Sequence, residues 1–133
     1  MATRVEKLSL LSEMIAFAKV DNTLKPIEYN FLKGIAAQLD VTDSDFNYLL
    51  NHPVNLAYPK TYSERIVQFH RLVLLMNLSD EIDDRKWVKI HNFGLRMGLS
   101  QESINKVLDL MDSFPDKIVP PDVLIDIFKV QYN

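Results

Sequence analysis

Residues 78–108 read LSDEIDDRKWVKIHNFGLRMGLSQESINKVL, and residues 20–50 read VDNTLKPIEYNFLKGIAAQLDVTDSDFNYLL. The shift that carries Thr3 onto Thr61 aligns the two stretches without a gap, and it places apolar residues on apolar residues. The aligned pairs include Leu24 with Ile82, Leu32 with Ile90, Leu39 with Met97 and Phe46 with Ile104. Internal similarity at a fixed period is typical of a duplicated structural unit.

Helix start signals recur at the same shift. Thr3 and Thr61 are each followed, three residues later, by a glutamate, which is the capping-box pattern of a helix N-terminus. Apolar residues then return at helical spacing, and no segment alternates convincingly as a β-strand does. The sequence predicts about seven helices, which begin near Thr3, Pro26, Thr42, Thr61, Asp84, Ser100 and Pro121.

The predicted fold is all-α. Two tandem three-helix units, over residues 3–50 and 61–108, are expected to pack with pseudo-twofold symmetry, and residues 51–60 connect them. A C-terminal helix over residues 121–132 is expected to cap the array, as terminal elements of repeats often do. Residues 1–133 are expected to form a single domain, because a chain of this length can bury one core.

Helical spacing also predicts which residues face the core. In the first helix these are Val5, Leu8, Leu11, Ile15 and Ala18. In the second helix they are Ile27, Phe31, Leu32, Ile35, Ala36 and Leu39. Gly34 lies inside the second helix and is predicted to permit a close helix crossing. The apolar run from Leu72 to Met76 predicts that the fourth helix is the most enclosed one.

Composition and charge argue against several classes of function. The formal net charge is −3, with acids and bases mixed along the chain, whereas nonspecific nucleic-acid binding needs a concentrated basic surface. Cysteine is absent, so disulfides and thiolate metal sites are excluded. No apolar run is long enough to cross a bilayer, and the N-terminal residues lack the pattern of a signal peptide. We therefore expect a cytoplasmic domain with no nucleic-acid partner and no direct membrane insertion.

A candidate metal site lies at the turn between the first two helices. Asp21 stands just before this turn and Glu28 stands in the first turn of the second helix, so their carboxylates can converge. Calcium and magnesium prefer oxygen ligands of this kind, although calcium usually takes about six or more. In the alternative interpretation Glu28 complements the positive end of the helix and Asp21 is solvated. Both interpretations stay open at this point.

The corresponding turn of the second unit is more acidic. Its candidate acidic surface consists of Asp80, Glu81, Asp83 and Asp84. Ser79 and Lys86 stand where the first unit has its two carboxylates. The acids suit a solvated helix N-terminus, which they stabilise through the helix dipole. A second hypothesis is that Lys86 serves this cluster as an internal counter-charge, in place of a cation.

This second hypothesis predicts that Lys86→Glu creates a thermal stabilisation that depends on divalent cations. The substitution removes the internal positive charge and adds a carboxylate to the acidic cluster, so a bound cation would favour the folded chain. Melting curves recorded with and without calcium measure the effect. Identical curves would contradict the hypothesis.

The sequence offers little support for an enzyme. His52, His70 and His91 show no metal-ligand spacing, and we expect each to be hydrogen-bonded or exposed. The sequence has no glycine-rich phosphate loop and no nucleophile elbow. We therefore expect a non-enzymatic protein with no catalytic residue and no required cofactor, unless the acidic turn takes up calcium or magnesium.

At its two turns the chain resembles the TerB-like tellurite-resistance family, whose members carry an A-D-G-x-(I/V)-x-x-x-E motif at each of these junctions. Asp21 and Glu28 match the acids of the motif, with Asn22 in place of its glycine and Leu24 as its apolar anchor. The segment Glu81-Ile82-Asp83 matches the middle of the second motif, while Ser79, Asp80 and Lys86 depart from it. Related domains occur at the N-terminus of a membrane-anchored J-domain co-chaperone of the DjlA type.

The resemblance covers about residues 3–113, and it implies an all-helical, non-enzymatic intracellular domain with an acidic surface proposed to bind metal ions and a role in stress-response assemblies. We therefore expect an interaction module that binds a protein partner. A divalent-cation-binding domain that uses Asp21 and Glu28 is the alternative, and only this alternative predicts saturable shifts of amide resonances near Asp21 on titration with calcium, magnesium or manganese. Self-association into a homodimer also stays open, because the terminal helix carries an apolar face.

Overall fold

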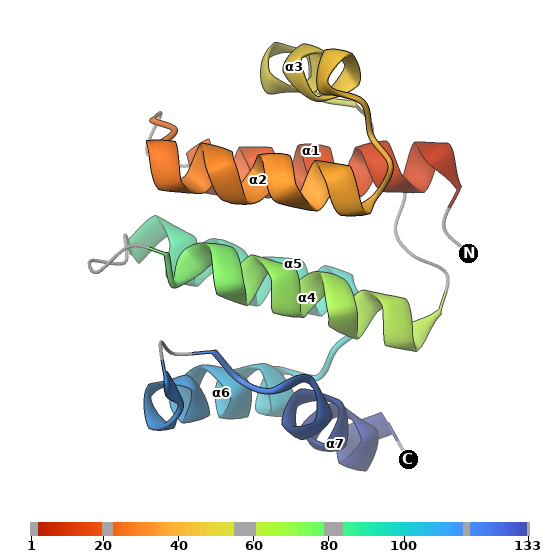
Figure 1. The fold of residues 1–133 in the computed structure, drawn as a ribbon. Helices are drawn as coiled ribbons and strands as arrows, with labels where there is room; N and C mark the ends of the chain where they lie inside the picture. Colours follow the sequence, from red (N-terminus) through yellow and green to blue (C-terminus); the bar gives the residue numbers. More distant parts are fainter. Residues whose placement is uncertain (1–2, 20–22, 55–60, 79–83, 116–117, 133) are drawn as a thin grey trace. The chain divides into compact units, whose positions relative to one another are not determined.

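The computed structural model describes residues 3–19, 23–54, 61–78, 84–115 and 118–132. These residues form seven α-helices and no strand (Figure 1). The helices are α1 (Arg4–Ala18), α2 (Pro26–Gln38), α3 (Asp43–Asn51), α4 (Tyr62–Met76), α5 (Asp84–Arg96), α6 (Gln101–Leu110) and α7 (Pro121–Tyr132), with a short 3₁₀ turn, η2 (Met111–Ser113), after α6. The predicted all-α fold is confirmed.

Side-chain caps at the predicted positions explain where the helices begin. The Thr3 hydroxyl accepts the backbone N–H of Glu6 at 3.1 Å, which satisfies one of the unpaired donors of the first turn of α1. The helices α3, α4 and α6 are capped in the same way by Thr42, Thr61 and Ser100. Prolines open α2 and α7, where a missing N–H costs nothing, at Pro26 and Pro121.

Two of the helices end at a residue with a left-handed backbone. Asp40 follows α2 with a φ of 59°, and Gly98 follows α5 with a φ of 80°. In both turns the next backbone N–H bonds back to a carbonyl in the last turn of the helix, at 2.8 Å for Val41 and 3.0 Å for Leu99. This is the Schellman arrangement, which satisfies carbonyls that the helix end leaves unpaired. Glycine adopts this backbone without strain at Gly98, and the first unit makes the same turn with an aspartate.

The chain divides into two compact units, Met1–Pro59 and Lys60–Asn133. In the first unit α1, α2 and α3 pack pairwise on one another; in the second unit α5 and α7 each pack on both α4 and α6. The bounds of α1 and α4, and those of α2 and α5, agree under the repeat shift. The unit boundary falls within the predicted connection over residues 51–60, of which residues 55–60 lie outside the described part. The pseudo-twofold packing of the units stays a prediction.

Positions that the repeat makes equivalent are buried in both units. Leu32 and Ile90 are buried on α2 and α5, and Ile15 and Val73 are buried on α1 and α4. Such burial stabilises each side chain by about 1.5–3 kcal/mol relative to an exposed one. The apolar positions that define the repeat in the sequence are therefore core positions of the two units.

Two residues predicted to face the core are exposed instead. Val5 is 62% exposed and Ile27 is 51% exposed. In each case the next residue, Glu6 or Glu28, is the glutamate of the first helical turn, and this glutamate is buried. Adjacent residues on a helix point about 100° apart. The inward glutamate therefore leaves the preceding aliphatic side chain facing solvent.

Two predictions about close packing are also wrong. A Cβ atom added at Gly34 would meet nothing within 4 Å, so this glycine does not mark a helix crossing. The close approach lies at Gly94 in α5, where a Cβ would stand 2.4 Å from the Cδ1 of Ile104. The helix α4 has seven buried residues, whereas α1 has nine, which include the small polar residues Ser9 and Ser12. Ser12 can be buried on α1 because its hydroxyl accepts the backbone N–H of Val54 at 3.2 Å.

The helix α7 packs on α4 and α6 within the second unit. Phe128 is fully buried, and its ring meets the Phe69 ring edge to face, with centroids 5.7 Å apart and 81° between the planes. The Tyr62 hydroxyl donates to the Phe128 carbonyl at 3.3 Å. Ahead of α7, Nε2 of His70 donates to the Val119 carbonyl at 3.0 Å. Through these contacts α4 holds both α7 and the segment that leads into it.

The half-buried imidazole of His70 makes the stability of the second unit depend on pH. Burial lowers the pKa of His70 below 6.5, the hydrogen bond to Val119 opposes this shift, and the charge of Arg71 adds to it. His70 therefore takes up a proton at a higher pH in the unfolded chain than it does in the folded chain. The contribution of His70 to the free energy of unfolding is fully present above pH 6.5. It is lost as the pH drops from 6.5 through the folded-state pKa of His70.

We expect His70→Gln to flatten this pH dependence. The glutamine side chain keeps an N–H donor for the Val119 carbonyl but does not titrate. Urea unfolding of both proteins between about pH 5.5 and 8, a range that spans the ordinary histidine pKa, measures the free energy of unfolding at each pH. The same slope in the wild type and the variant would show that His70 does not carry the effect.

Candidate functional site

The acidic turn of the first unit contains a helix cap. Glu28, the third residue of α2, is 1% exposed, and its Oε1 accepts the backbone N–H of Lys25 at 3.0 Å. This contact is the glutamate half of a capping box, and it explains why a carboxylate is buried at the positive end of the helix. Asp21, the other predicted metal ligand, lies outside the described residues. The structure thus gives Glu28 a structural role, and its pairing with Asp21 stays a prediction.

The acidic surface predicted for the second unit is described only in part. Asp84 is exposed at the first position of α5, whereas Asp80, Glu81 and Asp83 lie outside the described residues. Among the residues that the structure does describe, no three His, Cys, Asp or Glu side chains form a group that could hold a metal ion. The acidic surface therefore remains a sequence-based prediction.

Lys86 is buried in the register of Glu28. It is 3% exposed, so both units bury a charged side chain at the same position of the repeat, with opposite signs. A buried ammonium group is tolerated only beside groups that compensate its charge and its hydrogen bonds. The counter-charge hypothesis for Lys86 stays a prediction, because Asp80, Glu81 and Asp83 lie outside the described residues, and the calcium-dependent melting of Lys86→Glu is its test.

The histidines are held by neighbouring groups, as the sequence predicted. His52 stacks on Tyr48, with ring centroids 4.2 Å apart and 12° between the planes, and its Nδ1 lies 3.1 Å from the Tyr48 carbonyl. His91 lies between the Trp87 carbonyl, 2.9 Å from Nδ1, and the Asn105 side chain, 2.8 Å from Nε2. His70 bonds to the segment before α7. Each of the three imidazole rings therefore contacts a neighbouring group of its own unit.

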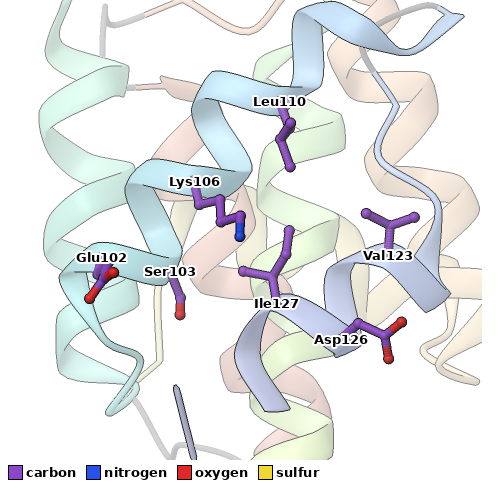
Figure 2. A pocket seen from close by; sticks show the side chains of 7 residues that line it. All are labelled: Glu102, Ser103, Lys106, Leu110, Val123, Asp126 and Ile127. Atoms are coloured by element: carbon purple, nitrogen blue, oxygen red, sulfur yellow. The ribbon is translucent and has the colours of Figure 1, made fainter. Parts of the chain in front are cut away.

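A groove of about 370 Å³ lies between α6 and α7 in the second unit (Figure 2). Its walls are formed by Glu102, Ser103, Lys106 and Leu110 from α6 and by Val123, Asp126 and Ile127 from α7. In Figure 2 Ser103 lies toward Ile127 and Leu110 lies at the other end of α6, toward the start of α7. The groove is therefore walled by about two turns of α6 and about one turn of α7.

Helical spacing explains why these side chains share the groove. Residues three, four and seven positions apart lie on one face of a helix, which is the spacing of Ser103, Lys106 and Leu110 on α6. Val123 and Ile127 have the same relation on α7. The sequence alone does not reveal this site, because the groove exists only once α7 has packed beside α6. The sequence feature that could have indicated the groove is the mixture of small, charged and aliphatic residues on one face of each helix.

The hydroxyl of Ser103 is the unusual group in this groove. Ser103 is 1% exposed, and its Oγ has no hydrogen-bond partner. Its backbone N–H is satisfied, because it donates to the Ser100 hydroxyl at 3.1 Å as part of the α6 cap. A buried polar group without a partner costs roughly 1–3 kcal/mol. The wall of the groove therefore holds a buried hydroxyl whose oxygen is left without a hydrogen-bond partner.

A second hollow, on α5, is lined by Lys89, Asn92, Leu95 and Arg96. All four side chains are exposed and belong to one helix, so the shape of this hollow depends on flexible surface groups. The α6–α7 groove has two walls from different helices and a buried polar group. It is the better candidate for a binding site.

Within the described residues, no helix combines the length and the apolar character that crossing a membrane would require. Comparisons of the chain with protein-family models, with curated proteins and with solved structures found no match.

Proposed function

We propose that this chain is a non-enzymatic, cytoplasmic interaction module of the TerB-like kind, and that it binds a segment of a partner protein in the α6–α7 groove. The assignment to a tellurite-resistance or stress-response role rests on the resemblance at Asp21 and Glu28. The lack of cysteine is compatible with a reducing compartment. The observation that carries the binding role is the buried, unpartnered hydroxyl of Ser103 in the wall of a groove between two helices.

The chemistry of the groove suits a protein segment. Leu110, Val123 and Ile127 offer aliphatic contacts, while charged side chains stand beside them. Protein interfaces share this arrangement, with apolar anchors inside and polar groups at the rim. The volume of about 370 Å³ is near the low end of the ~300–1,000 Å³ typical of ligand pockets. It gives room for a few side chains rather than for a large cofactor.

A catalytic use of the groove has less support. Ser103 is the hydroxyl-bearing residue among the described lining residues. A serine nucleophile needs a base within hydrogen-bond reach to take its proton. The Ser103 hydroxyl has no hydrogen-bond partner, and Lys106, one helical turn away, is exposed. Binding therefore explains the groove with fewer assumptions than catalysis does.

The test compares two substitutions on α7. Val123→Arg fills the groove and places a charge on its aliphatic wall, whereas Ile125→Arg adds the same side chain at a position that is 45% exposed and outside the groove. Partners captured from the host on the immobilised full chain are quantified by mass spectrometry. We expect Val123→Arg to lower recovery of a specific partner about tenfold or more, and Ile125→Arg to retain it.

The two variants are controls for each other. Circular dichroism and the fluorescence of Trp87, the single tryptophan, report whether each variant keeps the wild-type fold. If both folded variants recover the partner as well as the wild type does, the groove is not its binding site. If both lose it equally, the contact lies on the exposed face of α7 rather than in the groove.

A further inference from the structure

We infer that the outward faces of α5 and α7 bind one another between two copies of this chain, so that α7 of one copy lies on α5 of the next. The inference is independent of the proposed function, because it concerns the sides of these helices that point away from the core of the second unit. Three features carry it: the same spacing of exposed residues on both helices, opposite charges at matched positions, and an aliphatic residue at the centre of each face.

The outward face of α5 is basic. It consists of four exposed residues, Arg85, Val88, Lys89 and Asn92. Their spacing of i, i+3, i+4 and i+7 places them on one side of the helix over about two turns. The opposite side of α5, which contains Ile90, is buried. The face therefore presents two cations beside a valine that is 59% exposed.

The outward face of α7 has the same layout with opposite charges. It consists of four exposed residues at the same spacing, Asp122, Ile125, Asp126 and Lys129. The other side of α7 is buried, as Phe128 shows. Carboxylates thus stand at the two positions where α5 has its cations, and an isoleucine stands where α5 has its valine.

A parallel alignment of the two faces, in register, pairs every position with a complementary one. The aligned pairs are Arg85 with Asp122, Val88 with Ile125, Lys89 with Asp126 and Asn92 with Lys129. Opposite charges on facing surfaces fix the register and orient the partners. An antiparallel alignment would instead bring Arg85 against Lys129, and like charges disfavour that register.

The charged groups of the two faces are accessible to a second copy. Within the described part of the chain, Lys89, Asp122 and Asp126 have no ion-pair partner. Arg85 has a contact within its own chain, but a guanidinium has five N–H donors and can serve a second carboxylate as well. The faces therefore have charges that a neighbouring copy can pair.

The two faces point toward different neighbours. Both α5 and α7 pack on α4 and on α6, so each turns its buried side to these two helices and its outward face away from them (Figure 1). A contact between two unlike faces is heterologous, and it leaves one α5 face and one α7 face open on every pair. Such contacts continue into filaments unless a ring closes. The assembly is therefore expected to grow beyond a dimer.

The contact is small, so the association is expected to be weak. Two helical turns on each side bury far less than the ~1,200 Å² at which stable interfaces begin. Exposed ion pairs contribute little and are screened by salt. We expect a dissociation constant on the order of 0.1–1 mM at low salt.

The test is a charge exchange on the full chain. Sedimentation equilibrium over about 0.02–2 mM, a range that brackets the expected constant, measures association. Arg85→Glu/Lys89→Glu makes both faces acidic, and Asp122→Lys/Asp126→Lys makes both basic. We expect each variant alone to associate about tenfold or more weakly than wild type. An equimolar mixture of the two should recover association, because each α5 face then meets an α7 face of opposite charge.

Two controls accompany the exchange. Lys33→Glu/Lys106→Glu makes the same change of net charge at exposed positions of α2 and α6, and it should associate as wild type does. Circular dichroism reports whether every variant stays folded. Asp122→Lys removes an acid from the first turn of α7, where acids stabilise a helix. If that double variant unfolds, Lys89→Glu and Asp126→Lys, alone and mixed, test the same contact.

The outcomes decide the inference in either direction. Wild-type association that is lost in both folded variants, recovers in their mixture and weakens with added salt supports it. A wild type that stays monomeric over the whole range overturns it. Folded variants that associate alone as wild type does, a mixture that fails to recover association, or an equal loss in Lys33→Glu/Lys106→Glu also overturns it.

Discussion

Phe128→Ala is expected to lower the free energy of unfolding of the second unit by about 3–5 kcal/mol. Phe128 is fully buried between α7 and α4, and its ring contacts Phe69 edge to face. Alanine removes the apolar surface and the aromatic contact, and it leaves a cavity that a packed core cannot close completely. Since whole domains are stable by only about 5–15 kcal/mol, the loss is a large fraction of the total. Urea unfolding followed by Trp87 fluorescence, which reports on the second unit, measures it.

Ile125→Ala is the matched control for this substitution. Ile125 lies on the same helix but is exposed, so its truncation should change the free energy of unfolding by less than about 0.5 kcal/mol. Hydrogen exchange of α7 amides should accelerate in Phe128→Ala and stay unchanged in Ile125→Ala. A loss below about 1 kcal/mol for Phe128→Ala would mean that the core closes around the smaller side chain.

The helix boundaries could be predicted because they depend on local chemistry. A threonine or serine cap acts on an N–H within its own first turn, so Thr3, Thr42, Thr61 and Ser100 mark helix starts whatever packs around them. Gly98 marks a helix end for the same reason, since glycine adopts a left-handed backbone without strain. The repeat shift then transfers each assignment from one unit to the other.

The direction of individual side chains was less predictable. Val5 and Ile27 fit a helical apolar stripe, but the buried glutamates beside them turn them outward. Gly34 fits the pattern of a helix crossing, yet the crossing forms at Gly94. In each case the outcome depends on which neighbouring helix approaches the residue. Periodicity on a single helix does not contain that information.

The candidate groove could not be predicted for the same physical reason. Ser103 is, in the sequence, an ordinary polar residue in the first turn of a helix, where serine is common. Its place in the wall of a groove depends on α7, which packs on α6 and lies more than a helix length away along the chain. The acidic turn was recognisable because Asp21 and Glu28 are close in sequence. Local motifs are thus visible before the fold is known, whereas surfaces made by two helices are not.

The close approach at Gly94 leads to the second large expected effect. A Cβ atom there would stand 2.4 Å from Cδ1 and 2.9 Å from Cγ1 of Ile104, and 3.3 Å from Cε1 of Phe69. Carbon atoms prefer separations of about 3.5–4.0 Å. Ile104 and Phe69 are fully buried, so neither side chain has open space to move into. The glycine is therefore required by packing, although glycine weakens a helix interior.

We expect Gly94→Val to lower the free energy of unfolding by about 3 kcal/mol, the upper end of the usual cost of overpacking. The control is Gly34→Ala, which should raise it by about 0.5–1 kcal/mol, because Gly34 sits in a helix interior with nothing nearby for a Cβ to meet. Urea unfolding of both variants measures whether each substitution raises or lowers the free energy of unfolding. A neutral Gly94→Val would mean that α5 and α6 can separate at no cost.

A double-mutant cycle identifies the contact that causes the loss. Ile104→Ala alone should cost about 2–5 kcal/mol, because it opens a cavity in the core. In Gly94→Val/Ile104→Ala the new valine occupies the space that the isoleucine leaves, so each substitution offsets part of the damage of the other. We expect the double variant to be more stable than the sum of the single losses by about 1–3 kcal/mol. Strict additivity would place the strain of Gly94→Val elsewhere, at Phe69 or in the backbone of α5, and would show that the crossing does not depend on the pairing of Gly94 with Ile104.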